Sequence, residues 1–528
     1  MQMKAFLKNK FFLVLCAISV AYTLPVYNKF WAPFDEGIIL VAAQRLLAGE
    51  IPYKDFFIVM YPPGQIYVMG FLLELFSSSL IVGRLYTVAV STGISLVVFY
   101  MTLMLTGKRL ISLISWFFVL VALSPRLGAI PAPIWPGVFF SLAALYIYMR
   151  YLRRPAILSI LFSGFVGGLA VLFRHDIGIF ALVSIMGSLF VGFFYDKKAI
   201  QKIAFFTAGA LLAILPAFLY FAAKSATQDV INSLVLFPFV HQKTAGLSFP
   251  APCFDLRMIF HGSLFFIKVN QYYIPALVYL YAFLHLLKQF FKKELHKKKN
   301  LASLSILIFG VLTFNQVITR TDPAHLLTVI APAAILFGFM LQKTLSRKVN
   351  LKSAAAYVYI AIIFSLFVLL SVKNVDKYVK NVFRKIYKKQ IVKTRFTKGE
   401  IYLPAEERPE VLGVLEYINS NTRPGERIYL GNIVHGKDDF GGSTILYFLA
   451  DRLPSTKYYE FLPGLITDPA VQREIKNSLV KHNVRLIVLQ DIDLGGGSPR
   501  TKLDDFIAEN YELIKKFGKY NVYMCKES

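Results

Sequence analysis

Long apolar segments recur through the first 372 residues of this 528-residue chain, and they constrain its fold more than any other feature. Each has about the 17–25 residues that an α-helix needs to cross a bilayer. Only 17% of the residues are charged and 56% are hydrophobic, whereas soluble domains carry about 25% charged residues. These values exclude a soluble enzyme, a fibrous protein and a disordered scaffold. Because lipid-facing backbone must satisfy its own hydrogen bonds, we expect a polytopic α-helical membrane protein.

The apolar segments predict about eleven transmembrane helices. Their ranges are roughly 11–27, 80–105, 110–124, 136–150, 156–173, 177–195, 203–222, 270–287, 301–318, 324–341 and 353–372. A shorter apolar segment, 63–77, contains Glu74 and is predicted to form an interfacial or re-entrant helix within the first outside loop, 28–79. The transmembrane domain as a whole is expected to cover residues 1–372.

The distribution of Lys and Arg predicts the orientation of the chain. Cations are concentrated in alternate connections, which are 1–10, 106–109, 150–155, 196–202, 288–300 and 342–352. Moving Lys or Arg across hydrocarbon costs about 2.5–3.5 kcal/mol, so this bias predicts a cytoplasmic N-terminus and places 373–528 outside. The Lys4, Lys8 and Lys10 start predicts an uncleaved anchor instead of a removed signal peptide. The net charge of +27 then requires no nucleic-acid partner.

Residues 400–528 have the composition of a soluble α/β domain. Helices are predicted at 408–421, 469–483 and 504–514, and strands at 427–430, 484–489 and 522–524. Before this domain, 373–399 is expected to be a basic juxtamembrane helix or linker, which contacts either anionic head groups or an anionic lipid substrate. The domain contains no GxGxxG, Walker A or metal-spaced Cys/His motif, and Gly495-Gly496-Gly497 is predicted to be a flexible loop. Three cysteines do not indicate a disulfide framework.

Four clusters of polar residues fall on the outside face of this predicted topology. They are Asp35-Glu36; Tyr53, Asp55 and Tyr61-Pro62-Pro63-Gly64; Arg174-His175-Asp176; and Arg320, Asp322 and His325. Ionisable groups at the ends of membrane helices are costly and usually mark a site.

Each cluster also has a structural explanation. Asp35 would cap the helix 36–48, and Pro62-Pro63-Gly64 would form the turn that starts the interfacial helix. Arg174 and Asp176 would form an ion pair that closes a loop, and Asp322-Pro323 would begin a helix.

Together the clusters suit transfer of a group from a phosphate-activated donor onto a hydroxyl or amine. A neutral acceptor needs a carboxylate that takes its proton, for which Asp35 is the candidate. The departing phosphate needs cationic donors, for which Arg174, His175, Arg320 and His325 are the candidates. Tyr53, Asp55, Tyr61, Asp176 and Asp322 would line the acceptor side or the loop. Because nucleotide donors are not available outside the cell, a lipid-linked phosphosugar is the expected donor.

Phe34-Asp35-Glu36-Gly37, residues 49–56 and Tyr61-Pro62-Pro63-Gly64 resemble the bacterial branch of the type C (GT-C) glycosyltransferases, similar to protein O-mannosyltransferases and aminoarabinose transferases. The resemblance covers roughly 1–345 and implies a GT-C-like fold, a polyprenyl-phosphate sugar donor and an inverting, usually metal-independent displacement. It assigns the base to Asp35, a support or acceptor-binding role to Glu36, and contact with the donor phosphate to Arg174 and His175. It also relates Arg320 to His325 to a late-loop motif.

The resemblance thus implies a hexosyl- or pentosyltransferase of the cell envelope in a bacterial inner membrane. No cofactor is expected, with a divalent metal as an open alternative. Its partners would be the donor, membrane lipids and a lipid, glycan or protein acceptor. A transporter or flippase is the main alternative, but transporters keep polar residues near the bilayer midplane in repeated halves. An anchor for the C-terminal domain and a polymerase or ligase of sugar chains are further alternatives.

Overall fold

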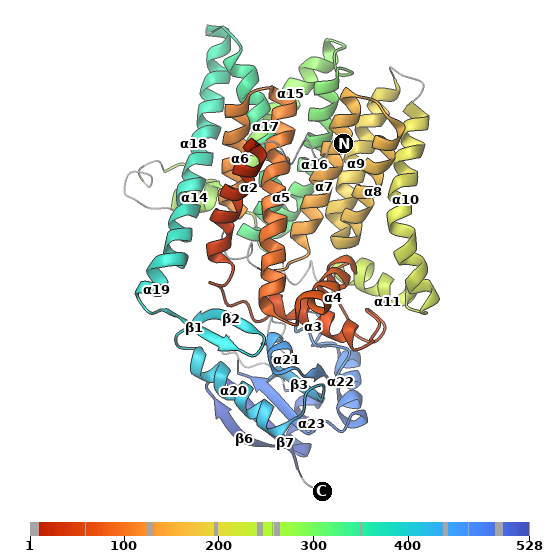
Figure 1. Cartoon of the computed structure of the whole chain (residues 1–528), viewed down its shortest axis with the longest axis vertical. Helices are drawn as coiled ribbons and strands as arrows, with labels where there is room; N and C mark the ends of the chain where they lie inside the picture. Colours follow the sequence, from red (N-terminus) through yellow and green to blue (C-terminus); the bar gives the residue numbers. More distant parts are fainter. Residues whose placement is uncertain are drawn as a thin grey trace.

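The protein consists of a helical bundle joined end to end with a smaller mixed domain (Figure 1). The computed structural model describes residues 10–58, 60–123, 130–194, 199–239, 246–255, 257, 265–348, 351–436, 442–462, 464–491 and 500–526. The start of the predicted anchor and Gly495–Gly497 lie outside these residues. The order of the parts follows the sequence, with the bundle first and the mixed domain at the C-terminal end.

Each of the eleven predicted spans coincides with a helix of the bundle. These helices are α2 (Lys10–Thr23), α5 (Leu80–Thr106), α6 (Arg109–Leu123), α7 (Ile134–Arg153), α8 (Ile157–Phe173), α9 (His175–Phe193), α10 (Ala199–Ala223), α15 (Tyr273–Phe291), α16 (Lys298–Thr319), α17 (Pro323–Leu345) and α18 (Leu351–Val379). Among the described residues, seven helices are long and apolar enough to cross a membrane: α5, α9, α10, α15, α16, α17 and the continuous helix from α18 to Tyr387. The polytopic helical fold class is confirmed, and the number of eleven spans stays a prediction.

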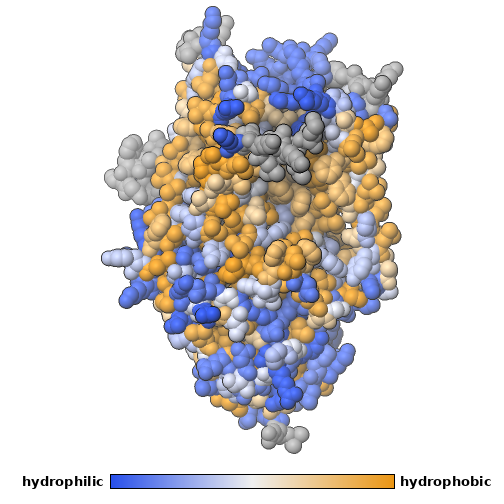
Figure 2. Space-filling model, viewed as in Figure 1, coloured by the Kyte–Doolittle hydropathy of each residue, from blue (hydrophilic) through white to orange (hydrophobic). Residues whose placement is uncertain are grey.

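The bundle buries its middle helix and exposes apolar side chains at its edges. Most of α17 is buried, whereas α10 carries exposed residues such as Leu212 and Leu219. A hydrophobic surface covers much of the bundle, and hydrophilic residues gather at its far end and over the C-terminal domain (Figure 2). Because apolar side chains lose nothing by facing lipid, this distribution fits an integral membrane protein.

Three short helices lie between the bundle and the C-terminal domain (Figure 1). They are α3 (Asp35–Leu47), α4 (Gly64–Phe76) and α11 (Thr227–Ile231), the last continued by η3 (Asn232–Leu236). α4 is the short helix predicted at 63–77, and the turn at Pro62-Pro63 precedes it, as expected. Another short helix, α14 (Phe265–Asn270), precedes α15 and packs near α18.

The chain leaves the bundle along α18 and enters the C-terminal domain through a β-hairpin. η4 (Lys380–Arg384) and α19 (Lys385–Tyr387) extend α18, and β1 (Ile391–Phe396) pairs antiparallel with β2 (Gly399–Pro404). The hairpin therefore begins within the segment expected to be a juxtamembrane helix or linker. Its backbone contacts the bundle end, where the N–H of Leu80 donates to the carbonyl of Lys398.

A five-stranded mixed sheet forms the core of the C-terminal domain. The strands are β3 (Arg427–Asn432), β4 (Leu453–Pro454), β5 (Leu486–Gln490), β6 (Tyr511–Phe517) and β7 (Tyr520–Cys525), in the order β4-β3-β5-β7-β6. The helices are α20 (Arg408–Asn421), α21 (Ile445–Ala450), α22 (Pro469–Lys481) and α23 (Lys502–Asn510). β3 is parallel to β4 and β5, whereas β7 is antiparallel to β5 and β6. The α/β character is confirmed.

The helix predicted at 504–514 is wrong in its second half. α23 ends at Asn510, and residues 511–517 form strand β6. The hydroxyl of Tyr511 donates to the carbonyl of Val484, and the strand pairs with β7. These long-range contacts override the local helical spacing.

Candidate functional site

Asp35 is the first residue of α3 and is exposed to solvent. Phe34 occupies the N-cap position of α3, and no side-chain hydrogen bond caps the helix. Asp35 is therefore not the capping residue that the structural explanation required. A carboxylate in the first turn of a helix is stabilised in its charged form by the helix dipole. The structure thus leaves an accessible carboxylate at the end of the bundle that faces the C-terminal domain.

Glu36, next in sequence, lies in the opposite environment. Its side chain is fully buried and forms a two-pronged ion pair with Arg84 of α5, with 2.7 Å between Arg84 Nε and Glu36 Oε1. Arg84 also donates to the carbonyls of Tyr27 and Phe30, each at 3.0 Å. These bonds fix the segment that leads into α3 against α5. Glu36 therefore supports the position of Asp35.

Arg174 lies between α8 and α9 and pairs with Asp176. The Nε of Arg174 is 3.0 Å from Asp176 Oδ1, and Asp176 Oδ2 accepts a 2.7 Å hydrogen bond from Gln316 of α16. A Cβ atom at Gly137 of α7 would lie 2.6 Å from the Cβ of Arg174, so only glycine leaves room for Arg174 there. The loop-closing ion pair is present. A guanidinium has five N–H donors, so this pair orients Arg174 and leaves capacity for a second anion.

Arg320 and His325 meet at the carboxylate of Asp322. The Nε of Arg320 is 3.1 Å from Asp322 Oδ2, and the Nδ1 of His325 is 2.8 Å from Asp322 Oδ1. Oδ1 also accepts from the backbone N–H groups of Ala324 and His325, so Asp322 caps the N-terminus of α17. Burial raises the pKa of Asp322, but its bonds to His325 and the nearby Arg320 outweigh this and hold the pKa below its usual value. The predicted helix start is confirmed.

Tyr61 is the residue on which charges from several of the predicted clusters act. The guanidinium carbon of Arg174 is 5.8 Å from the centre of the Tyr61 ring. Burial raises the pKa of Tyr61 to about 12. The positive charges of Arg174 and Arg320 oppose this shift, whereas the negative charges of Asp35 and Glu460 add to it. Charged residues from four distant parts of the sequence therefore act on one phenol group.

The first loop between α3 and α4 folds back to hold Tyr61 in place. The hydroxyl of Tyr53 donates to the carbonyl of Tyr61 at 2.8 Å, and Tyr53 is fully buried with φ +68°. Asp55 is exposed, and its Oδ2 accepts a 2.7 Å hydrogen bond from the N–H of Ile51. Both residues therefore shape the loop, and only Asp55 presents a polar group to solvent.

Glu460 is a member of this group that the sequence did not indicate. It lies in the C-terminal domain between β4 and α22, its residue is 1% exposed, and its charge acts on both Tyr61 and Tyr459. No sequence motif or spacing identifies Glu460, because its proximity to the first loop depends on how the C-terminal domain packs against the bundle. Sequence reasoning also missed Arg45, which donates to the carbonyl of Thr456 at 2.8 Å.

His175 is the least connected of the predicted residues. Within the described residues its buried Nδ1 atom has no hydrogen-bond partner, although its neighbours Arg174 and Asp176 flank it directly in sequence. Among all the residues that the structure describes, no three His, Cys, Asp or Glu side chains are grouped so that they could hold a metal ion.

No protein-family model matches the sequence, and no curated protein sequence matches it. Solved structures do match it. ArnT from Cupriavidus metallidurans bound to undecaprenyl phosphate superposes with a TM-score of 0.57 at 12% identity, over 98% of this chain and 98% of that chain. An oligosaccharyltransferase of Archaeoglobus fulgidus, tethered with an acceptor peptide, gives 0.54 at 10% identity, over 92% and 70%. AglB of the same organism, with an inhibitory peptide and a dolichol-phosphate, gives 0.51 at 11% identity, over 92% and 70%.

These similar structures are GT-C glycosyltransferases, and the likeness extends over nearly the whole chain. At such low identity it establishes the fold. The GT-C-like fold implied by the first-loop motifs is therefore confirmed, and it extends beyond residue 345 into the C-terminal domain.

Proposed function

We propose that this chain is an integral-membrane glycosyltransferase that moves a sugar from a polyprenyl-phosphate donor to an acceptor hydroxyl or amine. The observation that carries this proposal is that the Arg174 guanidinium lies 5.8 Å from the Tyr61 ring, at one end of the bundle, and that the charges of Asp35, Arg320 and Glu460 act on the same phenol. The GT-C fold supports it. ArnT was solved with undecaprenyl phosphate and AglB with a dolichol-phosphate, and both ligands correspond to the lipid-phosphate part of the proposed donor.

Asp35 acts as the general base in this proposal. The acceptor oxygen or nitrogen attacks the anomeric carbon as Asp35 takes its proton, and the bond between that carbon and the phosphate oxygen breaks. The anomeric configuration inverts in this single displacement. Asp35 suits the role because its carboxylate is exposed at the start of a helix, whereas the carboxylate of Glu36 is already bound to Arg84.

Arg174 and Arg320 stabilise the charge that develops on the departing phosphate. Each guanidinium is held in place by a carboxylate two residues away, Asp176 or Asp322, so its orientation is set before the donor binds. Fixed donors of this kind need little reorganisation during the reaction. His175 and His325 are the additional phosphate contacts, and His325 is oriented by Asp322 through its Nδ1.

The remaining predicted residues shape the acceptor side. Tyr61 lies beside Arg174, and Tyr53 supports its backbone. Asp55 is an exposed carboxylate of the same loop. The acceptor is a lipid, glycan or protein at the outer face of a bacterial inner membrane, and the sugar is a hexose or a pentose. No cofactor is required.

Mass spectrometry of membrane lipids and surface glycans tests this proposal. Cells that lack the gene should lose one glycoform, and the wild-type gene should restore it, whereas Asp35→Asn should not. Glu74→Gln, which changes an exposed carboxylate of α4, is the matched control and should restore it fully. Arg174→Ala should weaken donor binding more than Asp35→Asn does. Full restoration by Asp35→Asn would remove the base assignment, and an unchanged glycan and lipid profile without the gene would remove the enzyme.

A further inference from the structure

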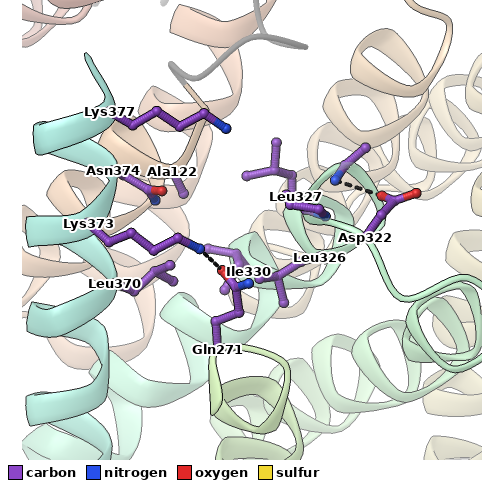
Figure 3. A pocket seen from close by; sticks show the side chains of 12 residues that line it. Ala122, Gln271, Asp322, Leu326, Leu327, Ile330, Leu370, Lys373, Asn374 and Lys377 are labelled. Atoms are coloured by element: carbon purple, nitrogen blue, oxygen red, sulfur yellow. Dashed lines mark hydrogen bonds between the residues drawn. The ribbon is translucent and has the colours of Figure 1, made fainter. Parts of the chain in front are cut away.

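A cavity of about 240 Å³ lies beside the site described above, between α17 and the end of α18. Ala122 at the end of α6 and Gln271 just before α15 close its other sides (Figure 3). Asp322 is one of the residues that line the cavity, and its Oδ2 atom pairs with Arg320 of the candidate site. The cavity therefore adjoins the candidate site without including Asp35, Tyr61 or Arg174.

Two lysines line one side of this cavity. Lys373 and Lys377 are four residues apart on α18, so they lie on one face of the helix, and both extend from it toward α17 (Figure 3). The Nζ of Lys373 donates to the Gln271 side-chain oxygen at 2.6 Å. Partly buried like charges repel each other, so this grouping favours a bound anion.

The remaining wall of the cavity is apolar. Leu326, Leu327 and Ile330 of α17 face Leu370 of α18. Asn374 adds a neutral amide beside the lysines. A small inorganic anion would make no use of the leucine side, whereas a hydrocarbon chain would bury it. The cavity thus combines a cationic end with a hydrocarbon-like wall.

The position of the cavity along α18 also fits a lipid. α18 begins at Leu351, and about 20 helical residues cross the hydrocarbon core, so Lys373 and Lys377 lie near the head-group level at the end that carries the C-terminal domain. Cations at this depth meet lipid head groups directly.

We propose that this cavity binds the phosphate head group of a membrane lipid, with the phosphate against Lys373, Lys377 and Asn374 and the first part of the chain against Leu327 and Ile330. The inference concerns binding and does not require sugar transfer. It assigns a function to the end of α18, which the proposed catalytic residues leave without one.

Native mass spectrometry of the full-length protein, titrated with defined lipids, tests the proposal. Wild-type protein should bind undecaprenyl phosphate, phosphatidylglycerol or both at least about tenfold more tightly than it binds phosphatidylcholine. Lys373→Gln/Lys377→Gln should lose this preference, and Lys373→Arg/Lys377→Arg should keep it because the charge remains. Lys380→Gln/Lys388→Gln is the matched control, since it removes two exposed charges beyond the cavity. Inorganic phosphate at millimolar concentration should compete poorly.

Each outcome decides the question. A preference for undecaprenyl phosphate that depends on the lysines identifies the carrier lipid, and equal binding of phosphatidylglycerol identifies a bilayer lipid. Unchanged lipid binding in the Gln double variant would overturn the proposal, as would full competition by inorganic phosphate. The Asp35→Asn protein should retain binding, so a failure of the proposed transfer reaction stays distinguishable from a failure of this site.

Discussion

Asp35 and Glu36 are adjacent in sequence and meet opposite physical demands. The exposed Asp35 has solvent to stabilise its charge, whereas the buried Glu36 depends on Arg84 for the same purpose. Removal of one partner from a buried ion pair leaves an uncompensated charge, which typically costs about 3–5 kcal/mol. One dipeptide therefore carries a candidate catalytic group and a structural one.

This contrast predicts different outcomes for two amide substitutions. Glu36→Gln should lower the free energy of unfolding by about 3 kcal/mol, because Arg84 then keeps a buried charge without its counter-ion. Asp35→Asn should leave thermal stability unchanged, because the side chain is exposed. Thermal unfolding of both purified variants, followed by intrinsic fluorescence, measures the difference. Equal melting temperatures for the two variants would contradict the structural role of Glu36.

A second buried polar group lies in the C-terminal domain. Asp504 Oδ1 is 2.6 Å from the Nδ1 of His435, and Oδ2 accepts from the N–H and hydroxyl of Thr501 at 2.7 Å. The Nε2 of His435 is 2.7 Å from the hydroxyl of Tyr429, so the four side chains form one network. This network ties the start of α23 to β3.

The network predicts a pH dependence of stability. Burial raises the pKa of Asp504, but its bonds to His435 and Thr501 outweigh this and leave the pKa below its usual value. The stabilisation is therefore complete above the unfolded-state pKa of about 4 and is lost as the pH falls through the lower folded-state value. Asp504→Ala should cost about 1.5–3 kcal/mol at neutral pH.

Hydrogen–deuterium exchange of residues 502–510 at about pH 6 measures this effect. The Asp504→Ala protein should exchange faster there, and its stability should fall less than that of wild type on acidification toward about pH 3. Asp505→Ala, which changes an exposed carboxylate in the same turn, is the control. A wild-type stability that rises on acidification would contradict the sign of the effect.

At the residue scale, the sequence indicated the polar groups of the bundle that act on Tyr61. It missed the groups whose role depends on contact with another domain or helix. Asp35, Arg174 and Arg320 could be found because charges at helix ends stand out against apolar segments. Glu460 does not stand out from its sequence neighbours in this way, since the C-terminal domain has the charge content of an ordinary soluble domain. The pairing of Glu36 with Arg84 was also out of reach, because it depends on which face of α5 turns toward α3.

At the scale of elements, the backbone contact between α4 and the end of α8 determines where Tyr61 lies. α4 begins at Gly64, and a Cβ atom there would lie 2.6 Å from the carbonyl oxygen of Leu172. Arg174 follows two residues after Leu172 and reaches the ring of Tyr61, three residues before Gly64. Close packing at this glycine thus sets the spacing between two parts of the candidate site.

Gly64→Ala should therefore reduce transfer activity. The added methyl group must push α4 away from Leu172, and a displacement of about 1 Å near reacting groups can cost on the order of 100-fold in rate. Overpacking of this kind costs about 1–3 kcal/mol in stability. Transfer measured in membranes, normalised to folded protein, separates the two effects. Gly192→Ala, at a position with open space around it, should change neither, and wild-type activity in Gly64→Ala would show that this contact does not position the site.

The membrane helices were the easiest elements to predict, because the apolar bilayer interior imposes the same requirement on each of them. The bundle helices follow from apolar length alone, because the bilayer selects for it. β6 could not be predicted, because its residues carry a helical spacing and become a strand only through pairing with β7. The hairpin β1–β2 was missed for a similar reason, since its basic residues fit a solvated helix as well as a strand.

At the scale of the whole molecule, the bundle and the C-terminal domain are joined by a charged cluster as well as by the chain. Glu50 of the first loop pairs with Arg45 of α3 and, at 2.6 Å, with Arg427 at the start of β3. Arg45 also donates to the carbonyl of Thr456 and packs on the ring of Tyr459. Each partner in this cluster loses a counter-ion if Glu50 is removed.

Glu50→Ala should loosen the two parts from each other. Arg45 and Arg427 would then face one another without a carboxylate between them, and their repulsion should speed hydrogen–deuterium exchange in α3 and β3 by about tenfold or more. Glu400→Ala breaks an exposed ion pair with Lys393 in the hairpin and should leave this exchange unchanged. If exchange in α3 is the same in both variants, the cluster does not hold the domains together.

The start of α3 touches the C-terminal domain through backbone on both sides. The N–H of Ile445 donates to the carbonyl of Pro33, the hydroxyl of Tyr459 donates to the carbonyl of Ile38, and a Cβ atom at Gly37 would lie 2.3 Å from the nitrogen of Ile445. A contact of this closeness requires two segments about four hundred positions apart in the sequence to match in shape. Chimaeras that graft the C-terminal domain of another protein without the matching stretch around Gly37 should therefore assemble poorly.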